Sequence, residues 1–280
     1  MIKSLSSIAS LLPFFFLIFG FCSLCESAEE PVKEQGKDVP GKLILKEIAL
    51  PASTSFWNSR IRNLGEYKPT LSGEKELLQY WLFLPKDESA KSADGFPLMI
   101  FLHGAGERGN NPELVKKHGP PKLLAKGAAD HWKFLTVAPQ CPDGKYWSPD
   151  QILAFLDELI LRYPIDQNRI YITGISMGGF ATWMLLNKAP ERFAAAVPIC
   201  GGGQLDHPEK VVSIPIRIFH GDADSVVSPQ FSRDFFDAIQ KAGGKKVELT
   251  LYKNVGHDSW TRTYANPDLY EWLLQQKKNP

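Results

Sequence analysis

The chain carries a succession of short apolar runs from residue 79 onward, most of them separated by stretches with helical spacing. A nearly continuous apolar run bounded by turn residues is typical of a strand that is buried on both faces of a sheet. The segment 245–253 instead alternates apolar and polar residues, which predicts a strand nearer an edge. A strand is predicted at 79–84, and buried strands are predicted at 96–103, 131–139, 168–175, 194–200 and 214–220.

The helical stretches between these runs have recognisable start signals. In each, a residue that can cap a helix is followed by a proline, which suits the first turn because its missing N–H needs no partner there. Apolar residues then recur on one face, as they do from Ile152 to Tyr163. Alternating strands and helices predict an α/β fold, a mostly parallel sheet with helices on both faces. The helix starts are Ser148-Pro149, Ser228-Pro229 and Asn266-Pro267, and Gly243 is placed to end the second helix.

The first residues have a different pattern. Lys3 precedes an apolar core at 11–22, and small residues follow at Ser27 and Ala28, as in a secretory signal peptide. The core is shorter than the ~20 residues that span a bilayer. We therefore expect an exported protein, periplasmic or secreted, with no transmembrane segment in the mature chain; a retained N-terminal anchor is the alternative. The expected divisions are a signal peptide at 1–28, a flexible leader at 29–45 and a single α/β domain at 46–280.

Composition and charge exclude some classes of function. The 280 residues are 44% hydrophobic and 22% charged, an ordinary globular profile. The formal net charge is +1 with scattered basic residues, so no nucleic-acid partner is expected. No pair of histidines has metal-ligand spacing, and we expect neither a metal nor a cofactor. The composition predicts no oligomeric state.

The stretch YITGISMGGF at 171–180 contains a G-x-S-x-G motif around Ser176. The motif alone is weak evidence, because chance often produces it in a chain of this length. Its context is more specific, since it follows a predicted buried strand and precedes a helical stretch, as a nucleophile elbow requires. Ser176 then lies at a helix N-terminus, where N–H groups favour developing negative charge. The alternative is an ordinary N-cap serine.

A serine nucleophile needs a base, and the base needs an acid to orient it. In folds of this type the chain order is Ser, then Asp or Glu, then His. His257 follows the last predicted strand; it is favoured over His207, in a polar loop, and His220, which precedes the acidic residues. The acid candidates are Asp222 and Asp224, in the turn after His220.

A second glycine motif, GAGERG at 104–109, matches the G-x-G-x-x-G fingerprint of dinucleotide-binding proteins. That fold needs a helix that opens inside the motif and an acidic residue at the end of the next strand. Here the next helix start is Asn111-Pro112, after the motif, and the next strand ends in Ala138-Pro139. The context therefore argues against a dinucleotide site.

From about residue 79 to its end, the chain resembles the α/β-hydrolase superfamily. The matching stretches are FPLMIFLHGAGERG, VAPQCP, IDQNRIYITGISMGGFATW, HGDADSVVSP and GHDSW. It is most similar to the secreted carboxylesterase or "predicted peptidase" group. That group is related to dienelactone hydrolase, prolyl oligopeptidase-type hydrolases, feruloyl and acetylxylan esterases and polyhydroxybutyrate depolymerases. The resemblance implies an α/β-hydrolase fold for the domain at 46–280.

The resemblance also implies roles for particular residues. The acid of this family lies four residues after the His of an H-G-x-x-D pattern, which is Asp224, so Asp222 becomes a turn residue. The implied activity is that of an exported serine esterase that works through an acyl-enzyme. Ser176 attacks the carbonyl and His257 takes its proton, so the rate should rise with pH as His257 loses its own proton.

The same resemblance assigns the oxyanion hole. One donor is the backbone N–H of Met177, and the other comes from Ala105, with Gly106 as the alternative. Such donors are needed because the carbonyl oxygen becomes an anion in the tetrahedral intermediate.

The expected substrate is a small to medium ester, either a small molecule or one linked to a polysaccharide. Trp147 and Trp260 are candidates to line the substrate pocket, although each could pack in the core. Glu107 and Arg108 are candidates to contact a polar substrate or to pair with each other. The alternatives are a serine peptidase of the prolyl oligopeptidase type and an inactive hydrolase-fold binding domain.

Two cysteines, Cys141 and Cys200, follow the predicted signal peptide. Hydrolases of this fold place two strands between those that end near these cysteines. Three strand spacings give roughly 14 Å, whereas the Cα atoms of a disulfide lie ~5.5 Å apart. A disulfide would therefore require the Cys141 loop to fold back across the sheet edge.

Overall fold

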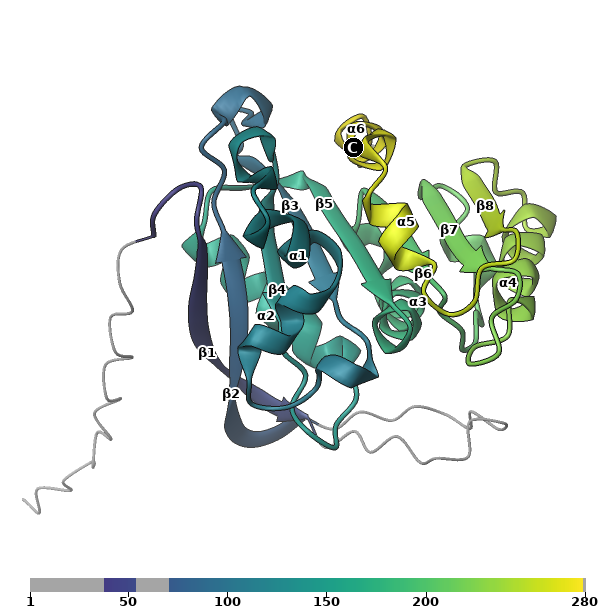
Figure 1. The fold of residues 1–280 in the computed structure, drawn as a ribbon, viewed down its shortest axis with the longest axis horizontal. Helices are drawn as coiled ribbons and strands as arrows, with labels where there is room; N and C mark the ends of the chain where they lie inside the picture. The colour runs from purple at the N-terminus through teal and green to yellow at the C-terminus, as the bar shows by residue number, and fades with distance from the viewer. Residues whose placement is uncertain (1–37, 54–70, 279–280) are drawn as a thin grey trace, which may run out of the picture. The chain divides into compact units, whose positions relative to one another are not determined.

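The computed structural model describes residues 38–53 and 71–278. Within these ranges, one sheet of eight strands runs in the order β1-β2-β4-β3-β5-β6-β7-β8 (Figure 1). The strands are β1 (Leu43–Ser53), β2 (Leu71–Phe83), β3 (Phe96–Leu102), β4 (Leu135–Pro139), β5 (Ile165–Ile175), β6 (Ala195–Ile199), β7 (Ile216–Gly221) and β8 (Val247–Tyr252).

Helices connect most of these strands, and short 3-10 turns occupy several loops. The α-helices are α1 (Gly119–Ala125), α2 (Pro149–Arg162), α3 (Met177–Lys188), α4 (Gln230–Lys241), α5 (Trp260–Tyr264) and α6 (Pro267–Leu274). The 3-10 helices are η1 (Glu88–Ala90), η2 (Ala105–Glu107), η3 (Pro112–Lys117), η4 (Ala128–His131), η5 (Pro190–Arg192) and η6 (Pro208–Lys210).

Strand direction agrees with the expected mostly parallel sheet. β2 pairs antiparallel with both of its neighbours, β1 and β4. From β4 across to β8 every pairing is parallel. The carboxyl ends of β3, β5, β6, β7 and β8 therefore meet at one edge of the sheet, where the loops that carry the candidate site begin.

Successive residues of each central strand enter cores on opposite faces of the sheet. In β3, Leu98 and Ile100 pack with α2, α3 and α4, whereas Met99 and Phe101 pack on the other face. That second face is covered by α1, α5 and α6 (Figure 1). All seven residues of β3 are buried, which explains its continuous apolar run.

The predicted helix starts are largely confirmed. Ser148 Oγ accepts a hydrogen bond from the N–H of Gln151 at 3.3 Å, and α2 begins at Pro149. Asn266 caps α6 in the same way. The helix predicted after Ser228 begins one residue later than the pattern suggests, at Gln230. Gly243 has φ 97°, a left-handed conformation that ends this helix.

The N-terminal edge of the sheet was not predicted. β2 is longer than the predicted 79–84, and β1 begins at Leu43, so the end of the range 29–45 is part of the sheet rather than a leader. Lys46 and Glu47 obscure the apolar pattern of β1, because they sit among half-buried residues and pair with Asp38 and Gln79. The predicted signal peptide and most of the leader lie outside the described residues.

Both cysteines that follow the predicted signal peptide are buried and free. β3 and β5 lie between β4, which ends before Cys141, and β6, which ends before Cys200. The strand order predicted from the resemblance is therefore confirmed. Of the helices that the structure describes, none combines the length and apolar character needed to cross a bilayer.

A buried ion pair anchors the start of β5, the strand that leads to Ser176. Asp166 is fully buried; its Oδ2 accepts from Arg169 Nε at 2.7 Å and Ser92 Oγ at 2.9 Å. Its Oδ1 accepts from the N–H of Asn168 at 2.9 Å. Burial alone would raise the pKa of Asp166, but these hydrogen bonds outweigh it and hold the pKa below its ordinary value.

We expect Asp166→Asn to lower the free energy of unfolding by about 3 kcal/mol, because Arg169 would keep its charge without a buried partner. In thermal melts the midpoint should fall by roughly 6–12 °C. Asp157→Asn is the matched control, because Asp157 pairs with Arg192 at the surface and is 60% exposed. Its cost should stay below about 1 kcal/mol. Equal losses for the two variants would contradict the anchoring role of Asp166.

Candidate active site

Ser176 occupies a sharp turn between β5 and α3. Its backbone has φ 50° and ψ −115°, values that a non-glycine residue rarely adopts, and such strain gathers at functional sites. The turn is held by hydrogen bonds from Ser176 N–H to Ile199 O at 3.0 Å and from Phe180 N–H to Ser176 O at 2.9 Å. Ser176 holds the N-cap position, but its side chain makes no capping hydrogen bond, so the N-cap interpretation does not explain this serine.

Glycines on either side of Ser176 allow the turn to pack tightly. A Cβ on Gly174 would overlap the carbonyl of Gly178, four residues later. A Cβ on Gly178 would overlap the carbonyl of Leu102, the last residue of β3. The G-x-S-x-G pattern therefore reflects two close backbone approaches, one within the turn and one to the neighbouring strand.

The side chains of Ser176, His257 and Asp224 form a continuous hydrogen-bonded chain. His257 Nε2 lies 2.9 Å from Ser176 Oγ, and His257 Nδ1 lies 2.7 Å from Asp224 Oδ2. Because a carboxylate only accepts, Nδ1 carries the ring proton and Nε2 is left to accept the proton of the serine hydroxyl. The three residues predicted as a triad are thus brought together from the ends of β5, β7 and β8.

Asp224 is held as an anion by the turn in which it lies. Its Oδ1 accepts from the N–H groups of Val226 at 2.8 Å and Val227 at 3.0 Å. Burial would raise the pKa of Asp224, but the hydrogen bonds from His257 and these two N–H groups keep it below the ordinary value. Asp222 instead accepts from the N–H of Asn254 at 2.7 Å, the behaviour of a turn residue.

His220 has the structural surroundings expected of a strand-end residue. Its ring is fully buried, with Nδ1 2.7 Å from Ser232 Oγ and Nε2 3.0 Å from Val227 O. Nε2 is also 3.2 Å from Asp224 Oδ2, so His220 packs behind the acid and supports its loop.

The loop after β3 is held in place by hydrogen bonds that its backbone carbonyl groups accept. Trp147 Nε1 donates to His103 O at 3.0 Å, the His103 ring contacts Gly104 O at 2.6 Å, and Arg108 Nε donates to Ala105 O at 3.0 Å. In a trans peptide the N–H points opposite to the carbonyl of the preceding residue. The N–H of Ala105 therefore points away from the His103 ring.

The second predicted donor lies at the start of α3. Met177 is its first residue, and the first N–H groups of a helix have no acceptor in a preceding turn. Ala105 is likewise the first residue of η2. Both predicted oxyanion donors are thus helix-start N–H groups.

His103 must be neutral to hold this loop. Its Nε2 accepts from the N–H of Cys141 at 2.9 Å, so its proton is on Nδ1 and is donated to Gly104 O. Burial lowers the pKa of His103 to about 4. The ring joins the end of β4 to the loop after β3, and only its neutral form can make both contacts.

A small apolar hollow lies at the start of α3. It is lined by residues from the loop before α2 and from the first turns of α3: Tyr146, Trp147, Met177, Phe180, Ala181 and Met184. Met177 follows Ser176 directly in the chain, so the hollow borders the first residue after the sharp turn.

The four predicted substrate residues have different surroundings. Trp147 is buried in the core and also lines the hollow, and its role toward a substrate stays a prediction. Arg108 lies over the Tyr146 ring at 5.1 Å and uses its donors on backbone carbonyls. Trp260 stacks edge-on to His257 with ring centroids 5.3 Å apart. Glu107 is buried and faces His118 rather than Arg108.

His118 was not predicted from the sequence. Its ring lies 5.4 Å from the Trp260 ring, and Trp260 Nε1 donates to His118 Nδ1 at 3.2 Å. Nothing local marks this histidine, because its partner Trp260 lies 142 residues later in the chain.

One group of candidate metal ligands overlaps the site. Atoms of Cys200, Asp224 and His257 lie within 4.8 Å of one another. Both ring nitrogens of His257 already have hydrogen-bond partners. Burial raises the pKa of Cys200 to about 12, so its sulfur stays a thiol, whereas metal binding needs the thiolate. These residues fit a hydrogen-bonded triad better than a metal centre.

Comparison with known proteins gives one family and several relatives. The model of the prolyl oligopeptidase family matches residues 142–205, which include Ser176. The chain is 30% identical to the poly(3-hydroxyalkanoate) depolymerase C of Paucimonas lemoignei over 130 residues, 38% of this chain and 31% of that protein. It is 26% identical to a bifunctional acetylxylan esterase/xylanase of Neocallimastix patriciarum over 191 residues, 64% of this chain and 26% of that protein. The chain thus spans less than a third of either relative.

Solved structures give the same fold. A thermostable esterase is 36% identical, with a TM-score of 0.62 over 72% of this chain and 60% of that one. The acetyl xylan esterase from Aspergillus awamori is 15% identical, with a TM-score of 0.55 over 70% of this chain and 94% of that one. The sheet order, the sharp turn at Ser176 and these relatives place the chain in the α/β-hydrolase superfamily. The chain is therefore a protein of the α/β-hydrolase fold, and its relatives include esterases.

We expect Gly178→Ala to destabilise the protein by at least about 3 kcal/mol, because the added methyl group would overlap the backbone of β3. Thermal melting measures this loss. Gly106→Ala is the control, because a Cβ there meets open space, and its effect should stay within about 0.5 kcal/mol. Similar melting temperatures for Gly178→Ala and the parent would contradict the close approach of the turn to β3.

The buried neutral state of His103 predicts a pH-dependent stability. Its pKa is about 4 in the folded protein against 6.5 ordinarily, so below pH 6.5 the unfolded chain binds the proton more readily. The contribution of neutral His103 to stability is fully present above pH 6.5 and is lost as the pH falls toward 4. From about pH 7 to pH 5 the free energy of unfolding should drop by about 2 kcal/mol on its account.

Urea unfolding of the parent and of His103→Gln at the two pH values tests this prediction. Glutamine cannot take up the proton, so the variant should be less stable at neutral pH but lose less on acidification. A slope of stability with pH that is the same in both proteins would exclude His103 as its source.

Proposed function

We propose that this chain is an exported serine hydrolase that cleaves carboxylic esters. The observation that carries the proposal is the unbroken contact from Asp224 to His257 to Ser176, at 2.7 Å and 2.9 Å, with Ser176 in a strained turn. A serine hydroxyl is a weak nucleophile alone, and this arrangement supplies the base and the group that orients it.

The mechanism follows from these contacts. Ser176 Oγ attacks the ester carbonyl while His257 Nε2 takes its proton, and Asp224 stabilises the imidazolium that forms. The N–H groups of Met177 and Ala105 receive the oxyanion of the tetrahedral intermediate. His257 then gives the proton to the leaving alcohol. Water attacks the acyl-enzyme with the same base, which releases the acid and restores Ser176.

Two considerations support an ester as the bond that is cleaved. The relatives named above include esterases and a polyester depolymerase. Apolar side chains line the hollow beside Met177, and we expect the acyl group to approach this face of α3. The match of residues 142–205 to the prolyl oligopeptidase family favours peptide cleavage as the second candidate.

Export is a separate part of the proposal. It is supported by the apolar core at 11–22 and the small residues Ser27 and Ala28. Periplasm and medium are both compatible with this pattern.

Ser176→Ala should lower kcat/KM for esters by roughly a thousandfold or more, because no other group can form the acyl-enzyme. Parent and variant would be compared on p-nitrophenyl acetate, butyrate and octanoate and on a chromogenic peptide. Faster cleavage of the peptide than of every ester would favour the peptidase candidate.

A fluorophosphonate probe separates an unusual substrate from an inactive fold. It reacts with an activated serine whatever the natural substrate, so it should label the parent and spare Ser176→Ala. A parent chain that is folded but neither labelled nor active would contradict the proposed function and leave the binding-domain alternative.

A further inference from the structure

A second carboxylate lies beside the nucleophile. Glu107 ends η2, in the loop that carries Ala105, and its side chain is only 9% exposed. Gly104 lies next to both residues. A Cβ added to Gly104 would lie 3.2 Å from Glu107 Oε2 and 3.6 Å from Ser176 Cβ. The carboxylate and the serine thus border the same small space above Gly104.

Among the described residues, His118 is the one that pairs with the Glu107 carboxylate. Its Nε2 lies 3.5 Å from Glu107 Oε1. Because Trp260 donates to His118 Nδ1, the ring proton of neutral His118 is on Nε2 and faces Glu107. A separation of 3.5 Å is longer than a normal N–H···O hydrogen bond, so within the described structure the carboxylate is incompletely paired.

An incompletely paired buried carboxylate at this place has two costs. Its side chain is only 9% exposed, so water can replace few of the hydrogen bonds that it would make in solution. Its negative charge also opposes the negative charge that develops on the carbonyl oxygen of a substrate held at Ser176. Both costs fall if the substrate brings a hydrogen-bond donor to Glu107.

The contacts of Trp260 indicate which part of the substrate would carry the hydrogen-bond donor to Glu107. The leaving alcohol must lie near His257, because His257 gives it a proton. Trp260 packs against His257 and bonds to His118, so Glu107, His118 and Trp260 form a wall on the leaving-group side. The apolar hollow at Met177 and Phe180 then remains for the acyl group.

We propose that Glu107, supported by His118, is a specificity-determining residue that accepts a hydrogen bond from a free hydroxyl on the leaving alcohol. This inference rests on the proposed esterase function. The substrate class is an ester between an apolar acyl group and an alcohol that carries at least one further hydroxyl.

A neutral hydroxyl fits this wall better than a cationic group. The segment 107–126, which carries both Glu107 and His118, holds five basic residues against two acidic ones, so its net charge does not favour a cationic alcohol. The five are Arg108, Lys116, Lys117, Lys122 and Lys126.

The test compares three butyrate esters that differ in the alcohol. Monobutyrin releases glycerol, which has two hydroxyls besides the esterified one. Propyl butyrate releases an alcohol of the same carbon length with no further hydroxyl. Butyrylcholine releases choline, a cation with no further hydroxyl. Hydrolysis is followed by titration of the released acid. The parent should favour monobutyrin over propyl butyrate by about tenfold or more in kcat/KM, the range of a hydrogen bond to a charged group.

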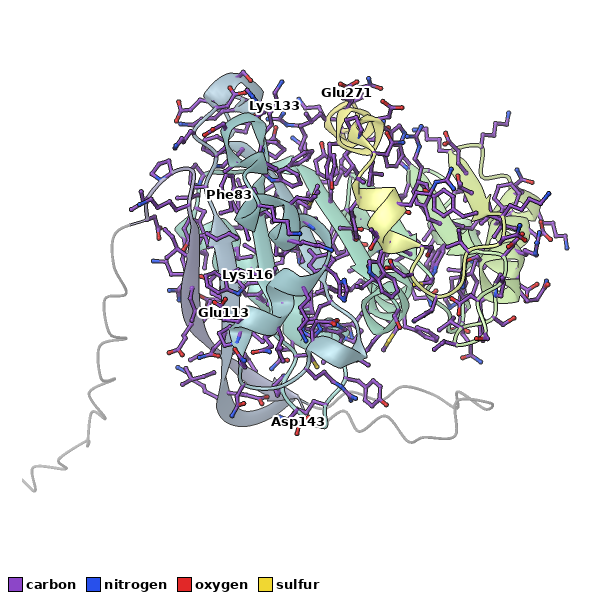
Figure 2. All side chains as sticks on the ribbon, viewed as in Figure 1. Phe83, Glu113, Lys116, Lys133, Asp143 and Glu271 are labelled. Atoms are coloured by element: carbon purple, nitrogen blue, oxygen red, sulfur yellow. The ribbon has the colours of Figure 1, made fainter. Side chains whose placement is uncertain are left out.

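Glu107→Gln keeps the shape of the side chain and removes its charge, so the preference for monobutyrin should fall by about tenfold. Glu113→Gln is the matched control. Glu113 lies on η3 near the same loop, is 62% exposed and pairs with Lys116 at 2.7 Å (Figure 2). It should leave the preference of the parent unchanged.

Other outcomes overturn the inference. If the parent hydrolyses monobutyrin and propyl butyrate at equal rates, the inference is wrong whatever the variants do. A preference of the parent for butyrylcholine over monobutyrin also overturns it. Equal losses of Glu107→Gln on both neutral esters would mark Glu107 as a positioning residue of the loop. In these cases cleavage of p-nitrophenyl butyrate keeps the esterase proposal intact. Absence of all hydrolysis and of fluorophosphonate labelling would instead overturn the proposed function itself.

Discussion

The close approach of the turn at Ser176 to the end of β3 is the constraint on which the candidate site depends. Gly178 packs directly on the carbonyl of Leu102, so the serine turn and the loop that begins at His103 are set at a fixed separation. In the proposed mechanism this contact sets the relative position of the N–H groups of Ala105, in η2, and Met177, in α3. A shift of either loop would change the separation of the two proposed donors, and catalysis is sensitive to such misplacement.

Two buried side chains that each hold one protonation state at neutral pH keep that arrangement rigid. Neutral His103 ties the loop after β3 to the end of β4, and anionic Asp224 ties His257 to the turn after β7. The pKa of each is lowered from its ordinary value, for His103 by burial and for Asp224 by hydrogen bonds that outweigh burial. Both directions favour the form that makes the observed contacts at neutral pH, so the geometry and the ionisation support each other.

The sequence predicted the parts of the fold that have strong local signals. The buried strands from β3 onward and the capped starts of α2 and α6 follow from apolar periodicity and from Ser148 and Asn266. β1 could not be recognised, because its charged residues interrupt the pattern and its stability comes from pairing with β2. Ser176, Asp224 and His257 were found through motifs at strand ends. His118 was not, because its contacts to Glu107 and Trp260 depend on tertiary structure alone.

The two buried carboxylates near Ser176 have opposite degrees of hydrogen bonding, and this difference separates their roles. Asp224 has two backbone N–H donors and the His257 ring, so its charge is satisfied within the protein. A satisfied carboxylate can orient its histidine but has little capacity left for a ligand. Glu107 faces a single histidine at 3.5 Å and keeps that capacity. Since burial of such a charge is unfavourable without a donor, its place beside the nucleophile is best explained by a donor that arrives with the substrate.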